Sequence, residues 1–206
     1  MQARYSYDRR KLDPAKLVTK YMGRVPSPKN LRYLTHKQWA TEVPETSEDR
    51  LMGGVSAITL PDGAILIREG FEDSAVHELL HIVGLMPDGI SEALNEGVTQ
   101  AVAEEICDKA GIPVRRTYAR EVKFAQHYIL PLMGQPLREF ARDYAAAPDK
   151  GAMIVDRIWG KYSQYFDSAD DWGDSAHIPV QLLKDLRSGL DYSLYLEYLV
   201  DELQVG

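Results

Sequence analysis

The sequence predicts an α+β protein, with a small twisted β-sheet in its first part and a mostly helical second part. Two observations lead to this prediction. Residues 54–60 and 64–68 are rich in β-branched and aliphatic residues, and residues 61–63 between them (Pro-Asp-Gly) are typical of a hairpin turn. From residue 73 onwards the apolar residues recur at helical spacing. The chain therefore changes from sheet to helix near residue 70.

The elements before the hairpin are expected to be a helix, a strand and a loop. Residues 14–22 begin with a proline and carry apolar residues at helical spacing up to Gly23, which predicts a short helix. Residues 31–35 alternate in polarity and favour a strand. Residues 43–49 are rich in Pro, Thr, Ser and Glu and are typical of a loop.

The elements after the hairpin are all expected to be helices. Asp73 is a candidate N-cap for the first helix, which Gly84 ends. The second helix begins near Ser91 and ends at Gly111. Further helical segments are expected at residues 117–133, 136–146, 153–166, 179–187 and 192–203.

Composition limits the class of protein. A chain of 206 residues with 45% hydrophobic content can bury a core of its own. No long linker or repeat divides it, so we expect one compact unit over residues 1–206, with an α/β upper part (1–86) and a helical lower part (87–206). The net charge of −7 gives no general attraction to phosphate backbones or anionic lipid. Neither nucleic acid nor a membrane is an expected partner.

The first residues and the single cysteine bear on location. Residues 1–20 contain several basic residues and no continuous apolar run, unlike a signal peptide, and no stretch has the length of a transmembrane helix. Cys107 is the only cysteine, so no intramolecular disulfide can form, and we expect a buried, inert thiol. The default expectation is a cytoplasmic protein, with export by another route left open.

Residues 77–81, His-Glu-Leu-Leu-His, form an HExxH pattern inside the first helix after the hairpin. Residues four positions apart lie on one face of a helix, so the imidazoles of His77 and His81 can share one metal ion. Glu78 is poorly placed to be a third ligand, but it can reach a water on that metal and act as a general base.

A catalytic zinc ion takes three protein ligands and keeps one position for water. The next helix offers Glu96, which lies fifteen residues after His81 across a turn containing glycine and proline. This spacing lets the two helices pack against each other, and Gly97 would allow them to approach closely. We therefore expect Glu96 to complete a Zn²⁺ site with His77 and His81.

The sequences HELLH (77–81) and LNEGVTQ (94–100) together resemble the gluzincin branch of the zincin metallopeptidases, the group that includes thermolysin. The resemblance covers about residues 50–133. It implies a zincin-like fold and a zinc metalloendopeptidase that acts on a peptide or protein substrate. It also implies that Glu78 is the general base and that Zn²⁺ is held by the two histidines and Glu96.

The resemblance further assigns residues around the ligands. Asn95 belongs to the family's Asn-Glu motif. Gln100 stands where thermolysin-like members carry an acid that orients a ligand histidine, and a neutral amide there is expected to raise ligand basicity less. Tyr118 is the first candidate for supporting the oxyanion of the tetrahedral intermediate, with His127 and His177 as reserves.

The family's upper-rim strand pairs with an extended substrate, and here it corresponds to residues 54–59. Gly54, Val55 and Ser56 are therefore the candidate substrate-binding residues. The last expected helix, residues 191–203, has two interpretations: it packs onto the helical part, or it occupies the cleft as an autoinhibitory segment.

The competing interpretation of the whole chain is a catalytically inactive binding or regulatory module, in which the same cluster only holds two helices together. A structural zinc site is closed by four protein ligands and has no use for a base beside an open position. The presence of Glu78 therefore favours an enzyme over this alternative.

Overall fold

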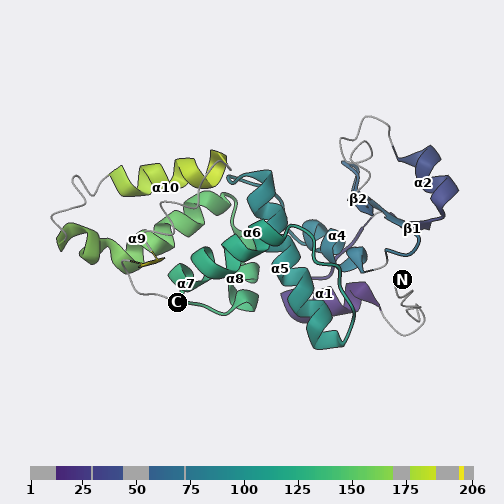
Figure 1. The fold of residues 1–206 in the computed structure, drawn as a ribbon, viewed down its shortest axis with the longest axis horizontal. Coiled ribbons are helices and arrows are strands. Elements are labelled where there is room, and N and C mark those ends of the chain that lie inside the picture. The colour runs from purple at the N-terminus through teal and green to yellow at the C-terminus, as the bar shows by residue number, and fades with distance from the viewer. Residues whose placement is uncertain are drawn as a thin grey trace.

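A computed structural model describes residues 13–28, 30–43, 56–71, 73–168, 177–188 and 200–201. These residues form an α+β fold that is mostly helical and contains one three-stranded mixed sheet. The sheet lies at one end of the molecule and the last two helices at the other (Figure 1). No helix in these ranges combines the length and the apolar character needed to cross a bilayer.

The first part of the chain contains α1 (Pro14–Met22), β1 (Asn30–Leu34), α2 (His36–Glu42), β2 (Ala57–Thr59) and β3 (Ala64–Arg68). Helix α1 and the β2–β3 hairpin confirm the sequence predictions, whereas α2 was not predicted. A capping box begins α2, because the Thr35 side chain accepts the Gln38 backbone N–H and the Gln38 side chain accepts the Thr35 backbone N–H. With two turns only, α2 is too short to show a clear helical period.

The sheet has the strand order β1-β3-β2, with β1 parallel and β2 antiparallel to β3. Both faces of the central strand β3 are covered, so its residues are apolar without alternation. Ile65 and Ile67 join the main core, to which α4 and α5 contribute. Leu66 on the other face packs with Leu34 and with Trp39 of α2.

The second part contains α4 (Ser74–Ile82), α5 (Glu92–Ala110), α6 (Ala119–Phe124), the π-helix η1 (Ala125–Ile129), α7 (Leu130–Met133), α8 (Leu137–Ala146), α9 (Lys150–Ser168) and α10 (His177–Ser188). The single helix expected at residues 117–133 is thus divided into α6, η1 and α7. Pro131 supplies a physical reason, because it has no N–H to bond the carbonyl four residues earlier. Of the final expected helix, only Val200 and Asp201 are described, and both are helical.

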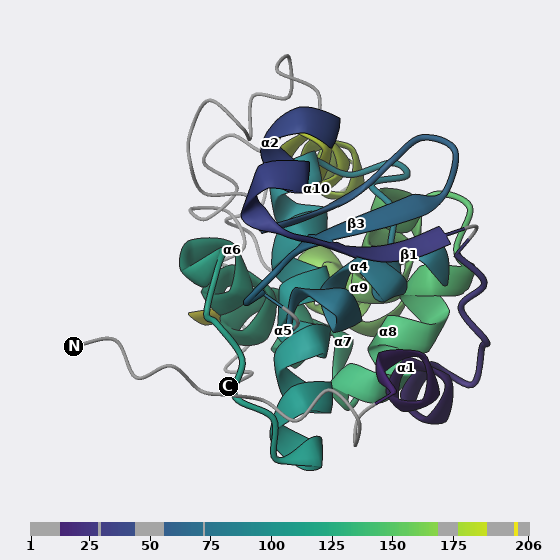
Figure 2. The ribbon, with the colours of Figure 1, turned by 90° about the vertical axis from the view of Figure 1, so that its right-hand side faces the viewer.

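Helix α5 occupies the centre of the fold and contacts α1, α4, α6 and α8. Figure 2 looks from the side of the sheet, behind which α4 and α5 lie. One hydrophobic cluster joins residues of α1, the sheet, α4, α5, α8, α9 and α10. Cys107 lies within this cluster, which confirms the prediction of a buried thiol, and burial raises the pKa of the thiol to about 12.

Candidate metal centre

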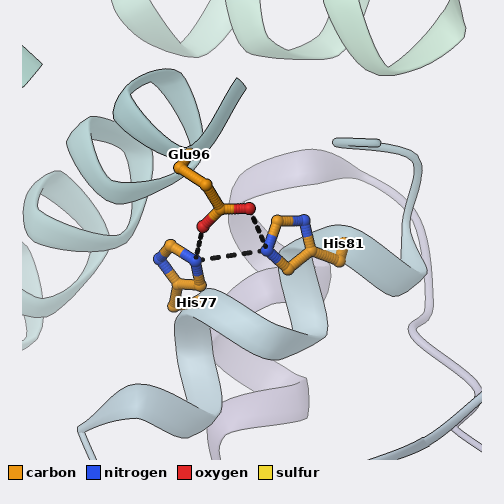
Figure 3. Close-up of side chains that lie close together, drawn as sticks. All are labelled: His77, His81 and Glu96. Carbon is orange, nitrogen blue, oxygen red and sulfur yellow. Dashed lines mark hydrogen bonds and ion pairs between the residues drawn. The ribbon is translucent and has the colours of Figure 1, made fainter. Parts of the chain in front are cut away.

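Helix α4 carries both histidines of the HExxH pattern on the face that it turns towards α5. Leu79 and Leu80 of the same helix are fully buried in the core and fix the rotation of the helix. His77 is 8% exposed and His81 half-buried, and Figure 3 shows both imidazoles projecting towards the Glu96 carboxylate, which comes from α5. The structure therefore brings together the three residues that the sequence predicts as metal ligands.

The three side chains meet at hydrogen-bonding distance. His77 Nε2 lies 2.9 Å from Glu96 Oε2, His81 Nε2 lies 3.3 Å from Glu96 Oε1, and the two Nε2 atoms are 3.2 Å apart. One ligand atom from each residue can be chosen so that all lie within 4.8 Å of one another. This group could hold a metal ion.

The proton position on His77 follows from its contact with Gln100. The Gln100 Nε2 group donates to Glu104 Oε1 at 3.1 Å and to the Arg115 carbonyl at 3.0 Å. Its Oε1 therefore faces His77 Nδ1, 3.0 Å away, as an acceptor. His77 carries its hydrogen on Nδ1, which leaves the Nε2 lone pair directed at the centre. Gln100 accepts the ring hydrogen bond that the resemblance assigned to this position.

A backbone carbonyl fixes the proton position of His81 in the same way. His81 Nδ1 lies 2.6 Å from the Leu85 oxygen, which can only accept, so Nδ1 donates and Nε2 keeps its lone pair. The Asn95 Nδ2 group donates to the same carbonyl at 3.1 Å, and the Tyr144 hydroxyl donates to Asn95 Oδ1 at 3.0 Å. Asn95 thus supports His81 through the Leu85 carbonyl.

Two nitrogen lone pairs and a carboxylate therefore converge on one point, an arrangement that requires a cation. In the protein without metal, a proton bound to one of the two imidazoles can supply the positive charge. Burial lowers the pKa of His81, but the hydrogen bond and negative charge of Glu96 outweigh burial and raise the pKa to about 9. Burial raises the pKa of Glu96, but its contacts with the His77 and His81 rings outweigh burial and hold the pKa well below its usual range. The donor set fits a divalent metal ion.

Glu78 lies on α4 next to His77 but points to the sheet. Its side chain is 9% exposed, and its Oε2 accepts a hydrogen bond of 2.6 Å from the Thr59 hydroxyl at the end of β2. The candidate base is thus held by the strand that borders the site. Thr59 belongs to the strand that the resemblance assigns to substrate binding, but its contact with Glu78 was not predicted.

Among the described residues, strand β2 pairs only with β3, so its other edge is open within the described ranges. The Ser56 carbonyl accepts the Arg68 N–H at 2.8 Å, and the Leu60 N–H donates to the Ala64 carbonyl at 2.8 Å, so these groups face β3. Backbone groups alternate in direction along an antiparallel strand. The N–H and C=O groups of Ala57 and Thr59 therefore face the open edge.

Of the three predicted substrate-binding residues, the structure describes Ser56. Gly54 and Val55 lie outside the described residues. The Ser56 carbonyl is used within the sheet, and its hydroxyl lies 3.1 Å from the Ser74 hydroxyl at the start of α4. In the described part of the strand, outward-facing backbone groups thus come from Ala57 and Thr59.

Tyr118 lies beside the cluster, with its ring stacked on that of His77 at a centroid distance of 6.0 Å and an interplanar angle of 17°. It is the only non-glycine residue in the described ranges with positive φ (52°), a conformation that costs energy and often marks functional sites. Two hydrogen bonds of the Arg115 backbone hold the segment that leads to Tyr118. The Arg115 carbonyl accepts a hydrogen bond from Gln100, and the Arg115 N–H donates one to Asp73 Oδ2 at 3.0 Å. Asp73 makes this contact with its carboxylate and gives no side-chain cap to α4.

Of the two reserve histidines, only His127 has a described side chain. His127 is an exposed residue of η1, and the hydrogen bonds of the cluster do not include it. The side chain of His177 lies outside the described residues.

Gly97 allows a close helix approach, but with a partner that the sequence did not suggest. A Cβ atom on Gly97 would lie 2.5 Å from the Glu121 Cβ and 2.6 Å from the Glu121 carbonyl carbon. Gly97 therefore lets α6 approach α5, where the sequence suggested a close approach between the two ligand-bearing helices. Because Tyr118 is the N-cap residue directly before α6, this contact helps to hold Tyr118 near His77.

Comparison of the chain with protein-family models, curated proteins and solved structures finds no match.

Proposed function

We propose that the protein is a zinc-dependent metallopeptidase of the gluzincin type. The observation that carries this proposal is the convergence of two Nε2 lone pairs and the Glu96 carboxylate, next to a buried second carboxylate, Glu78. Together they supply three ligands and a base, which is the set that metal-assisted hydrolysis needs.

His77, His81 and Glu96 would hold the metal. Imidazole nitrogen and carboxylate oxygen are common zinc ligands, and three of them leave a position open for water or substrate. When bound, zinc polarises the scissile carbonyl and lowers the pKa of water to about 7. The contacts to Gln100 and to the Leu85 carbonyl keep both imidazoles in the tautomer that binds through Nε2.

Glu78 would act as the general base. It takes a proton from the attacking water and returns it to the nitrogen of the leaving amine, so one carboxylate serves both steps. Tyr118, stacked on His77, is the candidate for donating a hydrogen bond to the oxyanion.

The substrate would be an extended peptide lying along the open edge of β2. The outward N–H and C=O groups of Ala57 and Thr59 can pair with a peptide backbone, a mode of binding that adds a strand to the sheet. Affinity then comes from the backbone, and selectivity comes from the side chains on either side of the scissile bond.

The alternative is a catalytically inactive module in which the cluster only joins α4 to α5. Such a module needs a cation to balance the ligands but gains nothing from a further buried carboxylate. The position of Glu78, 9% exposed and one residue from a ligand, therefore supports the enzyme.

The test is the variant Glu78→Gln, compared with wild type and with Glu139→Gln, an exposed position on α8. All three proteins are loaded with zinc and incubated with a proteome-derived peptide library, and products are identified by mass spectrometry. We expect Glu78→Gln to retain zinc and to lose about 10²- to 10⁴-fold in kcat/KM, since it removes the base but keeps the shape. The control should match wild type. A zinc-loaded wild type that cleaves no peptide would support the inactive module instead.

A further inference from the structure

A hydrogen bond joins the outer strand β2 to Glu78. It runs from the Thr59 hydroxyl to Glu78 Oε2 and measures 2.6 Å. We propose that Thr59 is a positioning residue, which holds the base in place and couples its position to the pairing of substrate with β2. This inference rests on the proposed function, because it assigns Glu78 the role of the base.

The direction of the Thr59 side chain follows from the alternation along β2. Ala57 belongs to the main core, to which α4 contributes, whereas Ile58 packs on the opposite face with the cluster around Trp39. Thr59, two residues after Ala57, faces the same side as Ala57. Its hydroxyl thus reaches the helix that carries the HExxH residues.

Strand β2 is fastened to α4 at two successive points. Ser56 meets Ser74 in the first turn of the helix, and Thr59 meets Glu78 one helical turn later. The two contacts set the position of the strand along the helix. Of these two, only the Thr59 contact touches a residue that the proposed chemistry uses.

Within the described ranges, Glu78 uses Oε2 in this hydrogen bond, and Oε1 accepts none. A carboxylate side chain with three rotatable bonds loses its preferred direction when no partner fixes it, whereas a charge-assisted hydrogen bond of this length fixes it well. With Oε2 bonded to Thr59, Oε1 can accept the proton of the attacking water.

Substrate and base would then both contact Thr59, the substrate through its backbone and Glu78 through its hydroxyl. The backbone groups of Thr59 face the open edge, and its side chain holds Glu78. A peptide that pairs along β2 as far as Thr59 would immobilise the residue that aims the base. Part of the binding energy from strand pairing would then be used to position the base and would raise kcat. Peptides too short to reach Thr59 should therefore have a low kcat.

The experiment compares Thr59→Val, which keeps the shape and loses the hydroxyl, with Thr59→Ser, which keeps the hydroxyl. The matched control is Thr19→Val, which removes a threonine hydroxyl bonded to the Ala15 carbonyl within α1. The substrate is the peptide that wild type cleaves fastest in the library. We expect kcat of Thr59→Val to fall about 10- to 100-fold with KM within threefold of wild type. Thr59→Ser and the control should stay within threefold in both constants.

A second readout does not depend on activity. Thermal unfolding is measured in EDTA for wild type, Thr59→Val, Glu78→Ala and the double variant. If the hydrogen bond exists in solution, the fall in Tm of the double variant is smaller than the sum of the two single falls. Additive falls would show that the two side chains do not interact and would overturn the inference.

The outcomes separate this inference from the proposed function. If wild type cleaves peptides and Thr59→Val equals Thr59→Ser in kcat, the positioning role is wrong and the peptidase stands. If both Thr59 variants have a raised KM and an unchanged kcat, Thr59 only maintains the conformation of the strand that binds substrate, and the positioning role is again wrong. If wild type cleaves nothing, the proposed function fails, and the role in catalysis fails with it.

Discussion

The tautomers of the two histidines are set by groups outside the cluster. The Leu85 carbonyl can only accept, and the Gln100 amide is oriented by its own two acceptors. Both rings therefore present Nε2 to the centre before any metal arrives. A preorganised site loses little entropy on binding, which favours high metal affinity.

This arrangement makes Gln100 the residue whose loss should weaken metal binding most without removing a ligand. In Gln100→Leu, His77 Nδ1 loses its acceptor and the ring is free to rotate or to change tautomer. We expect zinc affinity to fall about 10- to 100-fold in competition with a chromophoric chelator. Gln181→Leu, at an exposed position of α10, is the control and should bind zinc like wild type. Equal affinity of the two variants would show that Gln100 does not orient the ligand.

At this scale, the sequence could predict what depends on helical spacing alone. His77 and His81 share a helix face because they are four residues apart. Glu96 lies fifteen residues after His81, on the next helix. The hydrogen bond from the Thr59 hydroxyl to Glu78 could not be predicted, because it depends on the direction in which β2 crosses α4. The role of the Leu85 carbonyl depends on the loop after α4, whose course the residue types do not determine.

At the scale of elements, α5 is the helix on which the site depends. It carries Glu96 and Gln100, and through Gly97 it receives α6 at a distance that excludes any side chain. The order Glu96-Gly97 thus places a proposed metal ligand and a close helix contact next to each other. A shift of α6 would move Tyr118 away from His77.

We therefore expect Gly97→Ala to destabilise the protein although alanine favours helix formation. The added Cβ would meet Glu121 backbone atoms at 2.6 and 2.8 Å, and such overpacking costs about 1–3 kcal/mol. The free energy of unfolding is measured by urea denaturation in EDTA. Gly160→Ala in α9, where a Cβ meets nothing within 4 Å, should instead be neutral or gain up to about 1 kcal/mol. Equal effects at the two positions would contradict the close approach of α6.

The elements that were predicted correctly are those with a clear start and stop. Helix α1 lies between Asp13 and Gly23, and α5 between Ser91 and Gly111, with both glycines in the left-handed conformation. The parallel pairing of β1 with β3 could not be predicted, because it joins strands about thirty residues apart and no short turn fixes the register. The division into α6, η1 and α7 depends on how the chain accommodates Pro131 in a continuous helical path.

At the scale of the whole molecule, one core extends through both parts of the chain. The site lies where α4, which packs under the sheet, meets α5, which packs against the later helices. Metal binding would therefore link two regions of the core. If the ion binds only the folded protein, it adds about 4 kcal/mol to the stability at a free concentration 1,000 times its Kd.

The central claim is that His77, His81 and Glu96 hold one zinc ion. Elemental analysis of the purified protein tests it most directly, with Glu96→Ala as the variant and Glu92→Ala, an exposed position one turn earlier on α5, as the control. We expect one zinc per chain in wild type and in the control, and a large loss of zinc in Glu96→Ala. Wild-type protein that binds no zinc after zinc add-back, or Glu96→Ala that keeps a full equivalent with unchanged affinity, would contradict the account.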